Sequence, residues 1–126
     1  MTFGVILDAG ALIAFERFDR RILALLVRVM DEGGEVVIPA SALAQVLRSP
    51  ARQVPLMRLL RQPTTVTEPL DRVSASFVGQ LLASAGTADI ADAHVVVCAR
   101  QHRHAVVTSD LDDLRRLGPE LTLIPV

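Results

Sequence analysis

The stretch FGVILD at residues 3–8 is a short apolar run with no helical period, and it ends in an aspartate, Asp8. Such a run predicts a strand buried on both faces, as in a parallel sheet. The stretch AVVTSD at residues 105–110 places a second aspartate, Asp110, just past another strand of this kind. Because ligands bind outside the carboxyl ends of parallel strands, both aspartates are candidates for one site.

Strands and helices alternate along the rest of the chain. We expect strands at residues 3–7, 35–38, 64–67, 105–108 and 121–125. We expect helices near residues 11–15, 20–31, 41–49, 56–61, 70–85, 89–102 and 110–117. Strands separated by helices indicate an α/β fold, a three-layer α/β/α sandwich with a central, mostly parallel sheet. No repeat or long linker divides the sequence, so we expect a single domain over residues 1–126.

Composition excludes several classes of protein. Hydrophobic residues make up 51% and the mean hydropathy is +0.42, which argues against disorder. No apolar run reaches the roughly 18 residues that span a bilayer, and residues 1–8 lack the basic region of a signal peptide. We therefore expect a cytoplasmic protein with no membrane partner. The single cysteine, Cys98, lies in an apolar run and is expected in the core, which excludes a disulfide framework.

Two further aspartates open the helix expected after Gly86. Asp89 and Asp92 lie in its first turn, and a parallel sheet would bring this junction to the same edge as Asp8 and Asp110. Carboxylates that converge repel one another and shift one another's pKa values unless a cation neutralises them. Mg²⁺ binds through one or two carboxylates, keeps several waters and binds phosphate. The sequence therefore indicates an aspartate-rich Mg²⁺ site.

Helix capping is the competing explanation for these aspartates. Aspartate is a preferred N-cap residue, and each position precedes or begins an expected helix. Asp89 and Asp92 fit an N-cap and its N3 neighbour, and Asp110 and Asp113 fit the same pattern. Asp112 is expected on the surface. A site is favoured because several acids gather at junctions that a parallel sheet would bring together.

Four segments resemble, in order and spacing, the PIN-domain family, and specifically the VapC-type toxins of type II toxin–antitoxin pairs. They are ILDAGALIA (6–14), VVIPASALAQVLRS (36–49), GTADIADAHVVVCA (86–99) and VVTSDLDDLRRL (106–117). Each segment is weak alone, but together they cover nearly the whole chain. The resemblance implies a Mg²⁺-dependent endoribonuclease, with Mn²⁺ as an alternative ion, that hydrolyses RNA phosphodiester bonds.

The resemblance also assigns residues by position. Asp8, Asp92 and Asp110 match the family's catalytic and metal-binding acids. Asp8 and Asp92 would hold the ion directly or through water, and Asp110 would complete the site or position the attacking water. Asp113 matches the trailing acid of the last segment. Ser109 would support the site by orienting water.

Gln45 departs from the family pattern, which has glutamate at this place. It shares a polar helix face with Ser41 and Arg48 and could still point into the cleft. A neutral amide binds a metal-bound water but supplies no charge, and Asp89 could replace the missing charge from the facing helix. The alternative is a catalytically weak or inactive PIN-like domain that acts by binding RNA or a partner.

Arginine supplies every cationic contact, because all 13 basic residues are arginine. Its planar fork suits phosphate, so Arg48 and Arg52 are expected to bind RNA. The alternatives are a solvated helix face and a docking surface for an acidic partner segment. The resemblance implies two protein partners as well, a VapB-like antitoxin and a second copy of the chain in a homodimer. The histidines are expected as surface or capping groups: His94, His102 and His104.

Overall fold

Five parallel strands form one sheet in the computed structural model, which describes residues 3–126. They are β1 (Gly4–Leu7), β2 (Glu35–Pro39), β3 (Thr65–Glu68), β4 (Ala105–Thr108) and β5 (Leu123–Pro125). The order across the sheet is β3-β2-β1-β4-β5, and every neighbouring pair is parallel. All the strands predicted from the sequence are present, in the predicted parallel arrangement.

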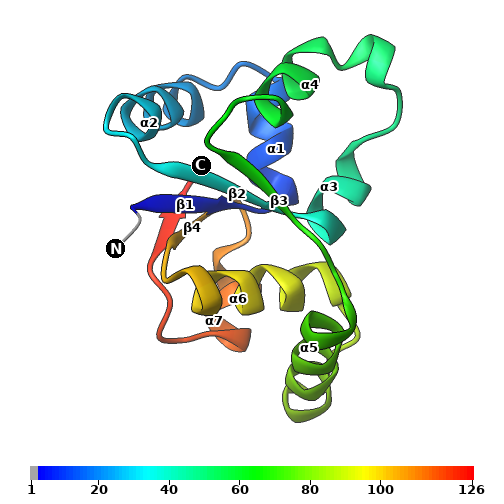
Figure 1. The fold of residues 1–126 in the computed structure, drawn as a ribbon. Helices are drawn as coiled ribbons and strands as arrows, with labels where there is room; N and C mark the ends of the chain where they lie inside the picture. The colour runs from blue at the N-terminus through cyan, green and yellow to red at the C-terminus, as the bar shows by residue number, and fades with distance from the viewer. Residues whose placement is uncertain (1–2) are drawn as a thin grey trace.

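Helices cover both faces of this sheet, which is seen nearly edge-on in Figure 1. They are α1 (Ala9–Glu16), α2 (Arg20–Asp31), α3 (Ala40–Val46), α4 (Val54–Leu60), α5 (Arg72–Ala85), α6 (Ile90–His102) and α7 (Leu111–Leu117). Helices α1, α2 and α4 lie on one side, and α6 and α7 lie on the other. Helix α3 contacts both α1 and α6. The predicted three-layer sandwich is confirmed.

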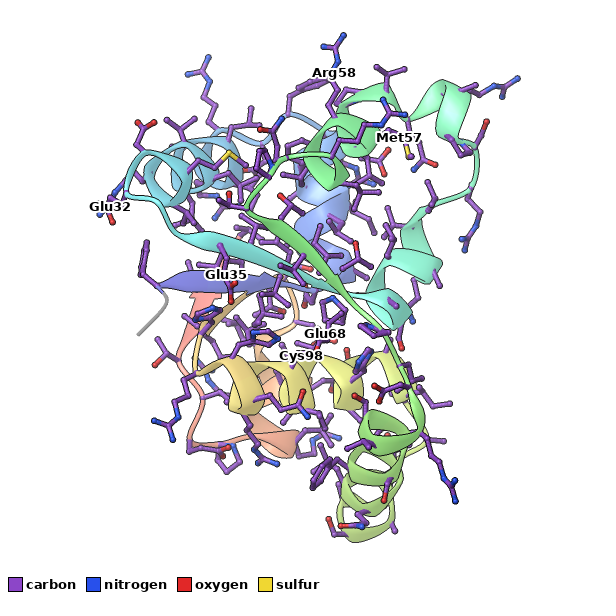
Figure 2. All side chains as sticks on the ribbon, viewed as in Figure 1. Glu32, Glu35, Met57, Arg58, Glu68 and Cys98 are labelled. Carbon is purple, nitrogen blue, oxygen red and sulfur yellow. The ribbon has the colours of Figure 1, made fainter. Side chains whose placement is uncertain are left out.

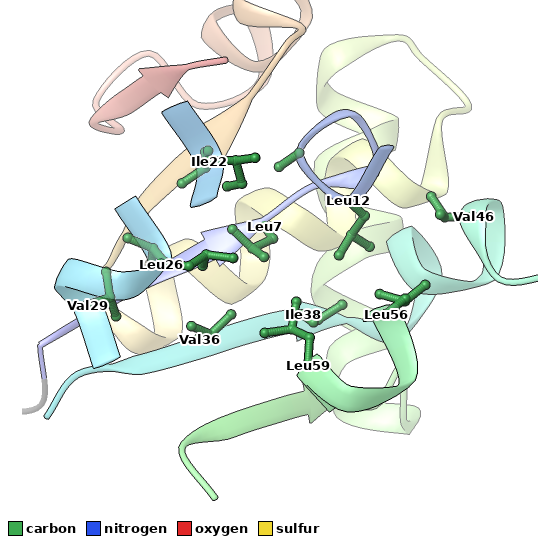
Figure 3. Close-up of a cluster of buried hydrophobic side chains, with 13 residues drawn as sticks. Leu7, Leu12, Ile22, Leu26, Val29, Val36, Ile38, Val46, Leu56 and Leu59 are labelled. Carbon is green, nitrogen blue, oxygen red and sulfur yellow. The ribbon is translucent and has the colours of Figure 1, made fainter. Parts of the chain in front are cut away.

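The core consists of two layers because alternate strand residues point to opposite faces. Leu7 and Ile38 pack in the layer with α1, α2 and α4, where Figure 3 shows them beside Leu12 and Leu56. The intervening residues, such as Ile6, pack against α6 and α7. Cys98 is fully buried in this second layer, as expected.

The largest difference between a predicted and an observed helix end is at α3. The helix expected to reach Ser49 ends at Val46, and Leu47 has extended backbone. The side chain of Gln53 explains this loop, because its Oε1 accepts hydrogen bonds from the amides of Arg48 and Ser49. A 3₁₀ turn, η1 (Pro50–Arg52), follows, in the interval between the predicted helices near residues 41–49 and 56–61.

Residues 3–126 contain no single helix that is long and apolar enough to cross a membrane. Helices α5 and α6 meet the length and composition criteria only as a pair, and they meet at an angle of 115°.

The chain reverses its direction across the sheet between β1 and β4. From β1 it runs to β2 and β3 on one side, and then crosses back to β4 and β5 on the other. Strands β1 and β4 are neighbours, with Leu7 opposite Val107. Their carboxyl ends therefore form a topological switch point, which is where open parallel sheets bind ligands.

Candidate metal centre

Asp8 lies at this switch point and caps a helix. It follows β1, and its Oδ1 accepts a hydrogen bond of 2.8 Å from the amide of Ala11 in the first turn of α1. Only 4% of the residue is exposed. Burial raises the pKa of Asp8, and the hydrogen bonds from Thr108 and Ala11 offset this only in part. Asp8 is thus both an N-cap and a buried carboxyl at the switch point.

Thr108 connects Asp8 to the second strand end. Its hydroxyl lowers the pKa of the Asp8 carboxyl and accepts a 2.8 Å hydrogen bond from the amide of Asp110. Next to it, the hydroxyl of Ser109 lies against Gly10, where any Cβ would collide with it. The sequence reasoning did not single out Thr108 or Gly10. The sequence features that could have indicated them are a hydroxyl residue at the end of a buried strand, for Thr108, and a glycine at the start of a helix, for Gly10.

Three aspartates converge beside this pair of strand ends. Asp92, Asp110 and Asp113 each place a carboxylate oxygen within 4.8 Å of the others. Asp89 caps α6, since its Oδ1 accepts a 3.0 Å hydrogen bond from the amide of Asp92. Asp110 makes no side-chain cap hydrogen bond within the described residues. Capping therefore explains Asp8 and Asp89 but not the convergence of Asp92 with the acids of α7.

The charges of this cluster disfavour its ionised form. Partial burial raises the pKa of Asp92 to about 7, and the carboxylates of Asp89, Asp110, Asp113 and Asp8 add to the effect in that order. Partial burial and the adjacent Asp113 carboxyl also raise the pKa of Asp110. Near neutral pH such a cluster binds either protons or a cation. Because the possible ligand atoms are all carboxylate oxygens, the cluster fits a hard divalent ion.

Two hollows lie beside Asp89, and the first of them also adjoins the cluster. One of about 250 Å³ is lined by Asp89, Asp92, Asp113 and Arg116, among others. The other, of about 520 Å³, is lined by residues that include Asp89 and Gln45. Asp89 therefore lines both hollows, and Gln45 lines the second one. The direction of the Gln45 side chain toward the aspartates, and its role there, stay predictions.

The candidate RNA-binding arginines differ in their contacts. Arg48 donates hydrogen bonds from Nη1 to the carbonyls of Ala44 and Leu47, at 2.8 and 3.1 Å, and so caps the end of α3. Arg52 lies exposed in η1. Their contact with RNA stays a prediction, and Arg52 is the less constrained of the two.

The expectation that the histidines are surface or capping groups is wrong for two of them. His94 is fully buried, and its Nδ1 lies 2.9 Å from the hydroxyl of Ser41, which is thereby engaged. His104 is also buried and lies 2.7 Å from Glu35. Helix α6 is buried over most of its length, so even its polar residues are drawn into the interior.

Comparison with known proteins agrees with this architecture. The PIN domain model matches residues 5–118, and the chain belongs to the PIN domain family. Among curated proteins, no significant sequence match is found.

Solved structures of the same fold cover nearly the whole chain. VapBC2 from Rickettsia felis, bound to a DNA fragment from its promoter, has a TM-score of 0.73 at 15% identity, covering 98% of this chain and 99% of that one. FitAB bound to an IR36 DNA fragment has a TM-score of 0.65 at 19% identity, with 96% and 94% covered. FitAcB from Neisseria gonorrhoeae has a TM-score of 0.64 at 21% identity, with 95% and 96% covered.

Proposed function

We propose that this PIN-family chain is a Mg²⁺-dependent endoribonuclease and the toxin of a VapC-type toxin–antitoxin pair. The observation that carries the proposal is the convergence of Asp92, Asp110 and Asp113 within 4.8 Å at the switch point. The raised pKa of Asp92, about 7, supports it, because this cluster is stabilised by a cation.

The proposed roles follow from burial. Asp92, which is half-buried, and Asp110, which is exposed, hold the ion directly, and Asp113 adds a third oxygen. Asp8 is buried and lies outside this group of three, and it contributes charge and contact through water. When bound, a divalent ion lowers the pKa of a water ligand and offsets negative charge on the phosphate. Asp89 keeps the first turn of α6 in place through its cap to the amide of Asp92.

The proposed partners rest on the resemblance to VapC-type toxins and on the likeness to VapBC2 and FitAB. We propose a VapB-like antitoxin that covers the cleft, a homodimer, and a cytoplasmic location in which RNA is the substrate. The whole of residues 1–126 is proposed to act as one domain.

Cleavage of cellular RNA by the purified, antitoxin-free protein tests the proposal. We expect fragments with Mg²⁺ or Mn²⁺, none with EDTA, and recovery when metal is restored in excess. Absence of cleavage by a folded sample at every metal concentration would favour the alternative, a PIN-like domain that binds RNA or a partner without cutting. The affinity of the protein for RNA, measured under the same conditions, would then test whether the domain binds RNA without cutting it.

Replacing Gln45 by glutamate is expected to strengthen the site. The new carboxylate would face the hollow that Asp89 also lines, and one more negative charge favours a divalent ion in this position. We expect Mn²⁺ to bind several-fold tighter, measured by calorimetry, with faster cleavage at limiting metal. Gln62→Glu, at an exposed amide on the α4 side, is the control. Equal effects of the two substitutions would contradict a role for residue 45.

Replacing Arg52 by glutamine is expected to weaken RNA binding and to reduce its salt dependence. Loss of one phosphate contact lowers the slope of log K against log salt by about one. Arg48→Gln should have a smaller effect, because that guanidinium is engaged by the α3 carbonyls. Arg28→Gln, at an exposed position of α2, is the control, and filter binding in EDTA over a salt series is the measurement. An unchanged slope for Arg52→Gln would remove Arg52 from the interface.

A further inference from the structure

We propose that Glu35, His102 and His104 form a second metal site, specific for a zinc-like transition-metal ion, at the opposite edge of the sheet from the aspartates. Glu35 begins β2, His102 ends α6, and His104 immediately precedes β4. One carboxylate oxygen and two imidazole nitrogens thus come from three separate elements.

The ligand atoms already lie close to metal-binding geometry. Oε1 of Glu35 is 2.7 Å from Nε2 of His104 and 3.2 Å from Nδ1 of His102. The three atoms all lie within 4.8 Å of one another. Tetrahedral Zn²⁺ with bonds of about 2.0–2.1 Å separates its ligand atoms by about 3.3 Å. Small side-chain movements are therefore enough to place an ion between them, with the fourth position open to water.

The surroundings favour these side-chain positions. The side chain of His104 is only 2% exposed, and its ring stacks on that of His102 with centroids 5.7 Å apart. Residue 4 is glycine, and a Cβ there would collide with the Glu35 carbonyl and come within 2.7 Å of Nε2 of His104. The glycine therefore leaves the proposed ligand nitrogen of His104 accessible.

An outer carboxylate completes the arrangement. Nε2 of His102, the nitrogen that faces away from Glu35, lies 3.6 Å from Oε1 of Glu68. Figure 2 labels both glutamates, which lie between the strands and α6. Histidines that bind metals commonly donate their second N–H to a carboxylate, which fixes the ring and increases its basicity. Glu68 is thus a positioning residue for His102.

The two sites are separate and differ in chemistry. Glu35 pairs with Gly4 at the start of β1, and Asp8 lies about 13 Å further along that strand. His102 lies about 15 Å along α6 from Asp92. Imidazole nitrogens select zinc-like ions, whereas all-carboxylate sites select Mg²⁺ or Mn²⁺. The second ion would stabilise the C-terminal end of α6, the helix that carries Asp92 in its first turn.

Calorimetric titration with Zn²⁺ near pH 7.5 tests the proposal on the full chain. We expect one Zn²⁺ per chain in the Asp92→Asn variant, in which the aspartate site is weakened. Added to Asp92→Asn, His102→Gln or Glu35→Gln should each weaken this binding at least about a hundredfold, and Glu68→Gln about tenfold to a hundredfold. Glu32→Gln, at an exposed glutamate nearby, is the control and should change nothing.

Nitrogen-15 NMR of the histidine rings gives an independent readout. Zn²⁺ should shift Nδ1 of His102 and Nε2 of His104, and leave His94 unchanged. Circular dichroism in EDTA tests whether each variant is folded. If one of His102→Gln and Glu35→Gln fails to fold, the other still tests the site. The proposal is overturned if Asp92→Asn binds no Zn²⁺, or if folded His102→Gln and Glu35→Gln bind it as tightly as their parent. Neither result bears on the proposed Mg²⁺-dependent RNA cleavage, which is measured in a separate experiment.

Discussion

Replacing Asp92 by asparagine is expected to reduce metal-dependent RNA cleavage at least about a hundredfold. Asparagine keeps the size of the side chain but removes the charge at the centre of the cluster formed with Asp110 and Asp113. Initial rates on one defined RNA, at saturating Mn²⁺ and at limiting Mn²⁺, are the measurement. The loss should be greater at limiting metal, because weaker ion binding then adds to the slower reaction.

Asp112→Asn provides a matched control for this substitution. Asp112 lies on α7 next to Asp113, but its side chain is 92% exposed and lies outside the cluster. It should retain most of the wild-type rate. Full activity in Asp92→Asn, or equal losses in both variants, would show that the cluster is not the site of cleavage.

The Asp92→Asn substitution is also expected to stabilise the metal-free protein at pH 8. Burial and the neighbouring carboxylates raise the pKa of Asp92 from 3.8 to about 7, so its ionised form opposes folding. Full conversion of that difference gives about 4 kcal/mol, and solvent screening of this partly exposed group reduces the expected gain to about 1–2 kcal/mol. Urea unfolding in EDTA, followed by circular dichroism, measures it.

The sign of the pH dependence follows from proton binding. Between pH 3.8 and about 7 the folded chain binds this proton more tightly than the unfolded chain, so wild-type stability falls as pH rises. The advantage of Asp92→Asn should therefore be absent below about pH 4 and complete above pH 7. Mg²⁺ or Mn²⁺ should reverse it by binding the folded wild type. A variant less stable than wild type at pH 8 in EDTA would contradict this account.

The strands β1, β2 and β4 were predictable because each is a short, mostly buried apolar run. FGVILD and AVVTSD both end at an aspartate, and the structure places their ends side by side. The end of α3 was not predictable, because it depends on Gln53. That side chain binds the amides of Arg48 and Ser49 and also donates to Glu16 on α1. Contacts of this kind between distant residues leave no periodic pattern in the sequence.

The residue types of the candidate site were predictable. Which aspartates cap helices and which converge on one another was only partly predictable. Sequence spacing predicted the cap that Asp89 makes to the amide of Asp92. It predicted the same capping pattern for Asp110 and Asp113, and could not show that Asp110 instead converges with Asp92 and Asp113. That outcome depends on the angle at which α6 and α7 meet the sheet.

The group at the other edge was missed for a related reason. His102 and His104 flank a turn, which favoured a surface interpretation, and Glu35 is distant in sequence. Only the parallel register, with Glu35 opposite Gly4 beside β4, brings them together.

Anomalous scattering from a crystal soaked in Mn²⁺ tests the central claim most directly. The account predicts a peak bonded to carboxylate oxygens of Asp92 and Asp110, at a concentration that also supports RNA cleavage. No peak at these aspartates under cleaving conditions, or Mn²⁺ bound only beside Glu35, would contradict the assignment of the aspartate cluster as the catalytic metal centre.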